Sequence, residues 1–267
     1  RRTLLASAAA AAATLSHTAA AQSAMAQSAP APGTPIMKRR VPQTGYMLPV
    51  VGIGTSRVFE FENDPEKLEQ RKQVVRDLVA GGGSLIDTAA GYGTAEANVG
   101  TVAEQTGLRA KLFLATKYSS RDSHDQAEAE MRQSLRRLKT NHADLQQAWN
   151  VNDPNFSTAQ MKDWKAAGLC GHYGITSSFD GAYDALAVVL RREKPEFFQI
   201  NYSLGDRDAA KTLLPLAMDS GSAVLTNLPF GRSSMFARVK GKPMPDFMAE
   251  IDCTSWANME QIGRAHV

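Results

Sequence analysis

The chain has 267 residues, 43% of them hydrophobic, which is enough for one large domain with a substantial core. Its formal net charge is +3, and three of the positive charges, on Arg1, Arg2 and Arg264, lie in terminal segments that we expect to stay outside the fold. The remainder is close to neutral, and this balance excludes a basic nucleic-acid-binding surface. We expect residues 36–260 to fold as a single domain.

The first residues are typical of an export signal. Arg1-Arg2 precedes an alanine-rich run, as in the remainder of a twin-arginine signal peptide, and small residues allow cleavage after Ala21 or Ala26. We therefore expect residues 1–26 to engage the twin-arginine export machinery and the protein to be periplasmic. The alternative, an alanine-rich disordered leader, does not explain the paired arginines. The run is too short and too rich in alanine to be a stable membrane anchor.

Two further terminal segments carry no expected chemistry. Residues 27–35 form a Ser/Ala/Pro/Gly linker, and residues 261–267 match what a common sequencing adapter encodes in one reading frame. We expect the natural chain to continue differently beyond about residue 260. Cys170 and Cys253 allow one disulfide or two reduced thiols, and no spacing of ligands predicts a metal site.

A hairpin is predicted over Met37 to Leu48, with Thr44-Gly45 as its turn. Apolar runs then alternate with amphipathic segments, such as the face shared by Ala127, Met131 and Leu135. The runs predict seven strands, at residues 50–53, 84–86, 112–116, 143–148, 173–176, 197–201 and 223–226.

Strand-then-helix repeats predict a parallel sheet in an α/β fold, either doubly wound or closed into a barrel. Gly52-x-Gly54 weakly resembles a dinucleotide-binding fingerprint, but Arg57 occupies the third glycine position and no helix opens there. Polar residues at successive strand ends instead favour a (β/α)8 TIM barrel. In this interpretation the N-terminal β-hairpin precedes the barrel, and the last strand and helices are missing from this chain.

Three residues stand where apolar runs give way to loops: Asp87, Tyr92 and Lys117. A lysine at a barrel mouth needs a carboxylate partner, and its charge beside a phenol is expected to lower the tyrosine pKa, so that Tyr92 can give a proton to a carbonyl oxygen. Each residue also has a structural interpretation, with Asp87 as a helix cap, Tyr92 as a packed loop aromatic and Lys117 as a solvated charge. Taken together, the three residues favour the catalytic interpretation over the structural ones.

These motifs resemble the aldo-keto reductases, and within them the twin-arginine-exported bacterial members, over about Met37 to Glu260. The resemblance rests on Asp87-x4-Tyr92-Gly93 and on the strand ending in Lys117. It also rests on residues 174–176, with Trp164-Lys165-Ala166 ahead of them, and on residues 199–203. It implies reversible hydride transfer between a nicotinamide cofactor and a small carbonyl substrate. Tyr92 would be the general acid, with Lys117 lowering its pKa and Asp87 orienting Lys117.

The resemblance also implies the cofactor site. NADP(H) is the family default and NAD(H) stays open; the protein is expected to be a monomer. Asn227 stands where the family usually has an aromatic residue that stacks under the nicotinamide. The implied cofactor-binding residues are Gly54, Thr55, Thr176, Ser177, Gln199, Asn227, Pro229, Gly231 and Arg232.

The fourth catalytic position departs from the family, because Trp149 stands where a histidine is usual. An indole N–H can donate a hydrogen bond but cannot titrate. His124, His142 and His172 are predicted to be structural, with His172 ahead of its strand. Two functions stay open: a reductase of aldehydes and ketones, or a cofactor-binding regulatory or interaction protein with little turnover. A barrel hydrolase lacks support, since no nucleophile–base spacing is present.

Overall fold

The computed structural model describes residues 36–251 and 253–259. These fall into two compact units, one comprising Ile36–Pro245 with residues 255–259, and the other Asp246–Thr254 with helix α9 (Phe247–Glu250). The first unit holds the sheet and all the candidate site residues. The predicted export signal, the linker and the adapter-like tail lie outside the described residues.

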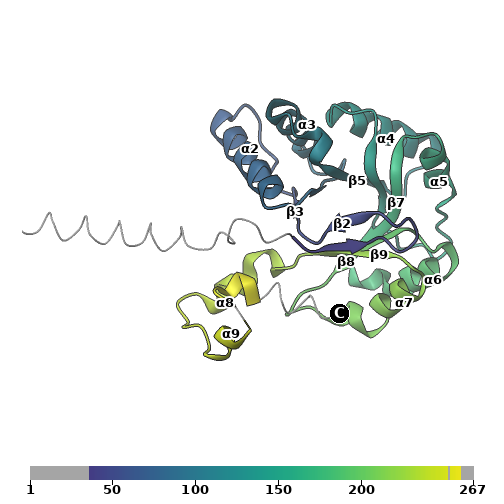
Figure 1. The fold of residues 1–267 in the computed structure, drawn as a ribbon. Coiled ribbons are helices and arrows are strands. Elements are labelled where there is room, and N and C mark those ends of the chain that lie inside the picture. Colours follow the sequence, from purple (N-terminus) through teal and green to yellow (C-terminus); the bar gives the residue numbers. More distant parts are fainter. Residues whose placement is uncertain (1–35, 252, 260–267) are drawn as a thin grey trace, which may run out of the picture. The chain divides into compact units, whose positions relative to one another are not determined.

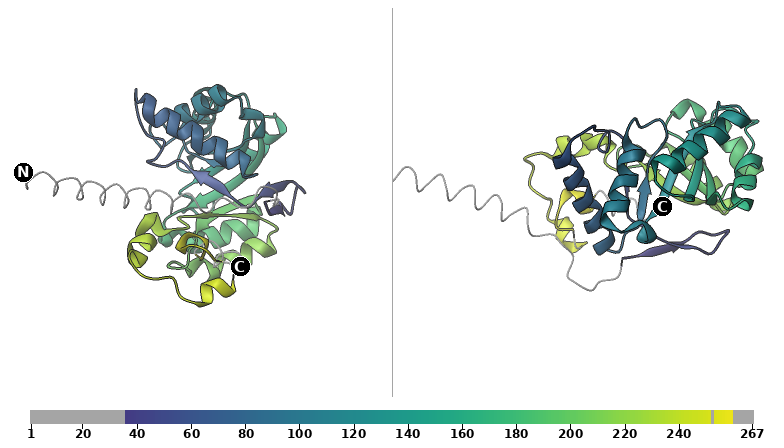
Figure 2. Two further views of the ribbon diagram at one scale, coloured as in Figure 1. Left: turned by 60° about the vertical axis from the view of Figure 1, so that its left-hand side comes forward. Right: turned by 90° about the horizontal axis from the view of Figure 1, so that it is seen from above.

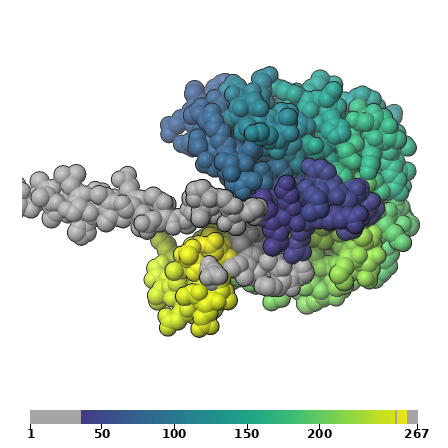
Figure 3. Space-filling model, in the orientation of Figure 1, coloured from purple at the N-terminus to yellow at the C-terminus, as the bar shows by residue number. Residues whose placement is uncertain are grey.

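The predicted hairpin is present. Strand β1 (Lys38–Arg40) pairs antiparallel with β2 (Met47–Pro49), and the connection is closed by a hydrogen bond from Val41 N to Tyr46 O of 2.8 Å. Gly45 in this connection has φ of 78°, a conformation that glycine adopts without steric cost. In Figure 3 the hairpin, coloured purple, lies against the teal and green part of the same unit.

All seven predicted strands are confirmed, in one parallel sheet that follows the chain order. The sheet curls, as Figure 1 shows, and this agrees with the predicted barrel fold. The observed boundaries differ from the predicted ones by up to three residues. The strands are β3 (Gly52–Gly54), β4 (Leu85–Asp87), β5 (Phe113–Ser119), β6 (Ala143–Trp149), β7 (Cys170–Ser177), β8 (Phe197–Asn201) and β9 (Ala223–Asn227).

Within the described part of the first unit, six α-helices connect the seven strands and lie along the outside of the curled sheet, and a further helix follows the last strand (Figures 1 and 2). Local sequence explains where several begin: Asp64 Oδ1 accepts from Lys67 N before Pro65, and Ser123 forms a reciprocal capping box with Gln126. The helices are α2 (Pro65–Ala80), α3 (Ala95–Thr106), α4 (His124–Arg137), α5 (Ala159–Ala166), α6 (Tyr183–Glu193), α7 (Leu213–Asp219) and α8 (Ser234–Val239).

The strands separate two apolar layers, because successive side chains point to opposite faces. Residues such as Ile86, Leu114 and Ile175 pack outward under the helices. The inner face forms a separate cluster closed by two hairpin residues; its members are Val41, Leu48, Leu85, Phe113, Ala115, Leu145, Phe197, Ala223 and Leu225.

His172 lies within β7 rather than ahead of it, so that prediction was wrong. Its ring packs against Tyr46, Phe113 and Phe197 at centroid distances of 5.6, 5.9 and 5.3 Å. The strand begins earlier than predicted because backbone pairing with β6 starts at Cys170. His172 therefore belongs to the aromatic plug at the hairpin end of the sheet, a structural position.

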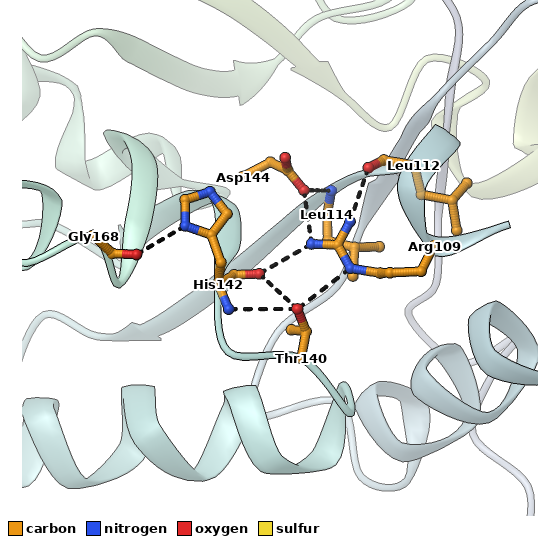
Figure 4. Close-up of polar contacts among 7 residues, drawn as sticks. All are labelled: Arg109, Leu112, Leu114, Thr140, His142, Asp144 and Gly168. Atoms are coloured by element: carbon orange, nitrogen blue, oxygen red, sulfur yellow. Dashed lines mark hydrogen bonds and ion pairs between the residues drawn. The ribbon is translucent and has the colours of Figure 1, made fainter.

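A polar cluster fixes the starts of β5 and β6 (Figure 4). Asp144 Oδ2 accepts hydrogen bonds from Leu114 N at 2.8 Å and from Arg109 Nη2 at 3.2 Å. The same guanidinium donates to the carbonyl oxygens of Leu112 and His142. Arg109 and Asp144 thus hold the beginnings of two neighbouring strands in register.

We predict that Asp144→Ala destabilises the protein by about 1–3 kcal/mol, because Leu114 N and the Arg109 guanidinium lose their shared acceptor. Chemical denaturation monitored by circular dichroism measures the effect. Asp163→Ala is the matched control, since Asp163 is an exposed acid on α5. Equal free energies of unfolding for the two variants would contradict the assigned role of Asp144.

Candidate active site

The predicted site residues gather at the carboxyl-terminal edge of the sheet because parallel strands all end there. On five strands an apolar residue of the inner cluster is followed two positions later by a polar residue on the same face. These polar residues are Asp87 after Leu85, Lys117 after Ala115, Gln147 after Leu145, Gln199 after Phe197 and Asn227 after Leu225. A polar layer therefore lies directly above the apolar interior.

Lys117 forms the central ion pair of this layer. Its Nζ lies 2.6 Å from Asp87 Oδ1 and donates to Thr88 O at 2.7 Å. The Lys117 side chain is only 3% exposed, so its ammonium is removed from water and depends on these two acceptors. The acid and cation predicted from neighbouring strand ends are in direct contact.

Tyr92 lies beside this pair, in the loop between β4 and α3. Lys117 Nζ is 5.4 Å from the centroid of the phenol ring, and the loop is closed by a bond from Tyr92 N to Ala89 O. Burial raises the pKa of Tyr92 to about 12, the charge of Asp87 adds to the increase, and the Arg232 guanidinium opposes it.

The expectation that Lys117 lowers the pKa of Tyr92 was therefore wrong. The positive charge of Lys117 is neutralised by Asp87 in direct contact, and removing the phenol from water disfavours the phenolate. Tyr92 is accordingly protonated throughout the neutral range. It can donate a proton, whereas its resting phenolate population is very small.

Trp149 ends β6 next to Tyr92. The two rings meet edge to face, with centroids 6.1 Å apart and planes inclined by 76°. Gly91 makes this contact feasible, because a Cβ at that position would lie 2.5 Å from Trp149 Cη2. Trp149, at the fourth catalytic position where a histidine is usual, thus forms a wall beside the phenol. The absence of a side chain at Gly91 leaves room for the indole ring.

Three amide side chains form a line across the layer. Gln147 Nε2 donates to Gln199 Oε1 at 2.8 Å, and Gln199 Nε2 donates to Asn227 Oδ1 at 2.7 Å. Among the described residues, no group donates to the buried Gln147 Oε1. Sequence reasoning missed Gln147, which lies opposite Lys117 in the strand register.

The remaining predicted cofactor-binding residues differ in burial and in their hydrogen bonds. Thr176 and Ser177 end β7 and are buried, and Ser177 Oγ accepts from Phe179 N. Thr55 is fully buried and donates to Asp87 O, so it holds the backbone of the acid, while Gly54 borders open space.

Pro229, Gly231 and Arg232 follow β9 in a loop whose backbone has φ of 53° at both Gly231 and Arg232. Pro229 and Gly231 are partly exposed and Arg232 is exposed. The effect of Arg232 on the Tyr92 pKa places its charge within electrostatic range of the phenol. The structure thus brings this loop toward the central group of residues.

Within residues 36–251 and 253–259, no group of three or more His, Cys, Asp or Glu side chains is arranged to hold a metal ion. The same part of the chain contains no helix with the length and apolar character needed to cross a bilayer. Cys170 and Cys253 are both free thiols.

A family model for the aldo/keto reductase family matches residues 50–266. The chain belongs to this family. Methylglyoxal reductase YeaE of Escherichia coli K12 is 32% identical over 194 residues, which are 70% of this chain and 66% of that relative. The chain thus spans just under two thirds of the length of this curated relative.

Solved aldo-keto reductases share the fold. A holo-form structure of AKR11C1 from Bacillus halodurans matches with a TM-score of 0.63 and 24% identity, covering 79% of this chain and 71% of that one. A Klebsiella pneumoniae aldo/keto reductase in complex with NADP and acetate matches with a TM-score of 0.64 and 21% identity, covering 81% and 76%.

We predict that Tyr92 titrates near pH 12, above the ordinary value of 10 for tyrosine, because burial disfavours the phenolate. The measurement is tyrosinate absorbance against pH for the wild type minus Tyr92→Phe. The Tyr92 component should be absent up to pH 10, with Tyr46→Phe as the control subtraction. A Tyr92 component with its midpoint at or below pH 10 would show that Lys117 does dominate.

Gly91→Ala should displace the Trp149 indole and destabilise the protein by about 1–3 kcal/mol, because the added methyl group overlaps the ring. In the Trp149→Ala background, Gly91→Ala should cost little, since the overlap is then gone. Denaturant melts of both single variants and the double variant measure the coupling. Gly54→Ala, whose Cβ would meet open space, is the control, and strictly additive losses would refute the contact.

Proposed function

We propose that this protein is an NADP(H)-dependent oxidoreductase that reduces aldehydes or ketones to alcohols, with Tyr92 as the general acid. The observation that carries the proposal is the buried Lys117–Asp87 pair beneath the Tyr92 ring, at the edge of the sheet where barrel enzymes place their chemistry. The similarity to the E. coli methylglyoxal reductase supports a carbonyl substrate.

The polar layer fits a nicotinamide carboxamide. The buried Gln147 Oε1 lacks a donor among the described residues, and the Gln147–Gln199–Asn227 line presents further amide groups at the same edge. Thr176 and Ser177 would complete this end of the site. Asn227 can offer a hydrogen bond but no ring for stacking, so the nicotinamide would be held by polar contacts.

The other end of the cofactor site would be formed by the loop after β9. Arg232 supplies a cation in the short helix Gly231–Ser233, which suits a pyrophosphate. NADP complexes of Klebsiella aldo/keto reductases support NADP(H) as the cofactor, and NAD(H) is the alternative to compare in the same assay. When bound, the cofactor supplies the hydride that the carbonyl carbon receives.

The residues of this chain handle the proton. Tyr92 Oη is protonated at neutral pH and donates to the carbonyl oxygen as negative charge develops there. Asp87 together with Thr88 O holds the Lys117 ammonium beside the phenol ring. Trp149 cannot exchange a proton at this pH, so it contributes shape and at most one hydrogen bond.

A second candidate function is cofactor binding for regulation or interaction, with weak or no turnover. The observation that favours it is Trp149 at the fourth position, combined with a Tyr92 pKa of about 12. Both reduce the capacity for proton exchange. Neither affects the residues proposed to hold the cofactor.

The test is a fluorescence titration with NADPH, followed by NADPH oxidation with methylglyoxal and other small aldehydes in the same cuvette. We expect binding with turnover, and Tyr92→Phe should lower turnover by about 100-fold or more while NADPH still binds. Tyr46→Phe, which changes a phenol of the hairpin plug, is the matched control.

Tight NADPH binding without oxidation of any aldehyde would support the second candidate. Turnover that survives Tyr92→Phe would remove Tyr92 from the role of general acid.

A further inference from the structure

A cavity of about 300 Å³ opens at the carboxyl-terminal edge of the sheet. Its walls come from the loops after β5, β6 and β7, three neighbouring strands. The lining residues are Arg121, Asn150, Asn152, Ser177 and Phe179. Among these, the proposed reductase mechanism uses only Ser177.

The polar groups that line this cavity are available to a ligand. Within the described part of the chain, the Arg121 guanidinium has no carboxylate partner, and the side-chain amides of Asn150 and Asn152 make no hydrogen bond. Asp122, the acid next in sequence to Arg121, lines a different surface hollow. An unpaired guanidinium with amide donors nearby suits a carboxylate, which it can bind through two parallel hydrogen bonds.

Phe179 gives the cavity an apolar side. Phe179 is 63% exposed and can contact a ligand in the cavity. It stands two residues after Ser177, whose hydroxyl accepts the Phe179 backbone N–H and fixes the turn. The cavity therefore suits a ligand that has an apolar body and an anionic end.

The chain connects the cavity to the proposed catalytic group at Trp149 and Asn150. The Trp149 ring contacts Tyr92, and the next residue, Asn150, lines the cavity. The backbone of Asn150 has φ of 56°, so the chain turns sharply between the two positions.

We propose that the substrates are carbonyl acids, with an aldehyde at one end and a carboxylate, separated by an apolar spacer, at the other; this rests on the proposed reductase function. Arg121 binds the carboxylate, which is unchanged by the reaction. The aldehyde carbon gains a hydride from NADPH, its oxygen gains a proton from Tyr92, and the products are the hydroxy acid and NADP+.

The test compares para-carboxybenzaldehyde with para-methylbenzaldehyde, two rigid substrates that differ at the far end of the ring. The wild type should show the higher kcat/KM with the acid. Arg121→Gln should lower the acid-to-neutral ratio of kcat/KM by about 10- to 100-fold, the range for a hydrogen-bonded charge pair, and Arg121→Lys should retain part of the preference. Arg191→Gln, on an exposed arginine of α6, is the control.

A wild type without preference for the acid, or a preference that Arg121→Gln leaves intact, would overturn the proposal while the reductase function stands. A second arm separates the two ideas: calorimetry with para-(hydroxymethyl)benzoate, which has the carboxylate but no carbonyl to reduce, with and without NADPH. Binding that depends on Arg121 in a protein that reduces no aldehyde would uphold the anion site and refute the reductase function. An absence of Arg121-dependent binding would overturn the anion site.

Discussion

The site depends on one buried charge. Lys117 has 3% of its side chain exposed, and an ammonium in such a place is stable only when a carboxylate and a carbonyl oxygen replace the lost water. Asp87 and Thr88 O supply these acceptors from the neighbouring strand. The same pairing neutralises Lys117, and this is why burial, and not the lysine charge, determines the pKa of Tyr92.

The two ends of the sheet are chemically opposite, and this polarity explains the division between stability and function. At the hairpin end, Tyr46, Phe113, His172 and Phe197 pack their rings together and close the interior. At the other end the inward positions are an ion pair and a line of amides. Because side chains two positions apart share a face, five of the strands contribute to both layers with residues only two positions apart.

Sequence reasoning predicted the strands and the Asp87–Lys117 pair, since apolar runs mark buried strands and parallel strands end at one edge. It could not find the role of Gln147, because the contact with Gln199 passes over β7. Gly174, opposite Gln147 in the register, contributes no side chain there. Desolvation of Tyr92 depends on tertiary burial, and the cavity lined by Arg121 and Asn150 is built by loops whose conformation no periodicity encodes.

The central claim is that Asp87 and Lys117 act as one unit beside Tyr92. A double-mutant cycle with Asp87→Asn and Lys117→Met, measured as the single-turnover rate of NADPH oxidation, tests it most directly. We predict that each single substitution slows the reaction and that the double variant is no slower than the worse single one. Losses that multiply in the double variant would show that the two residues act independently, and would contradict the account.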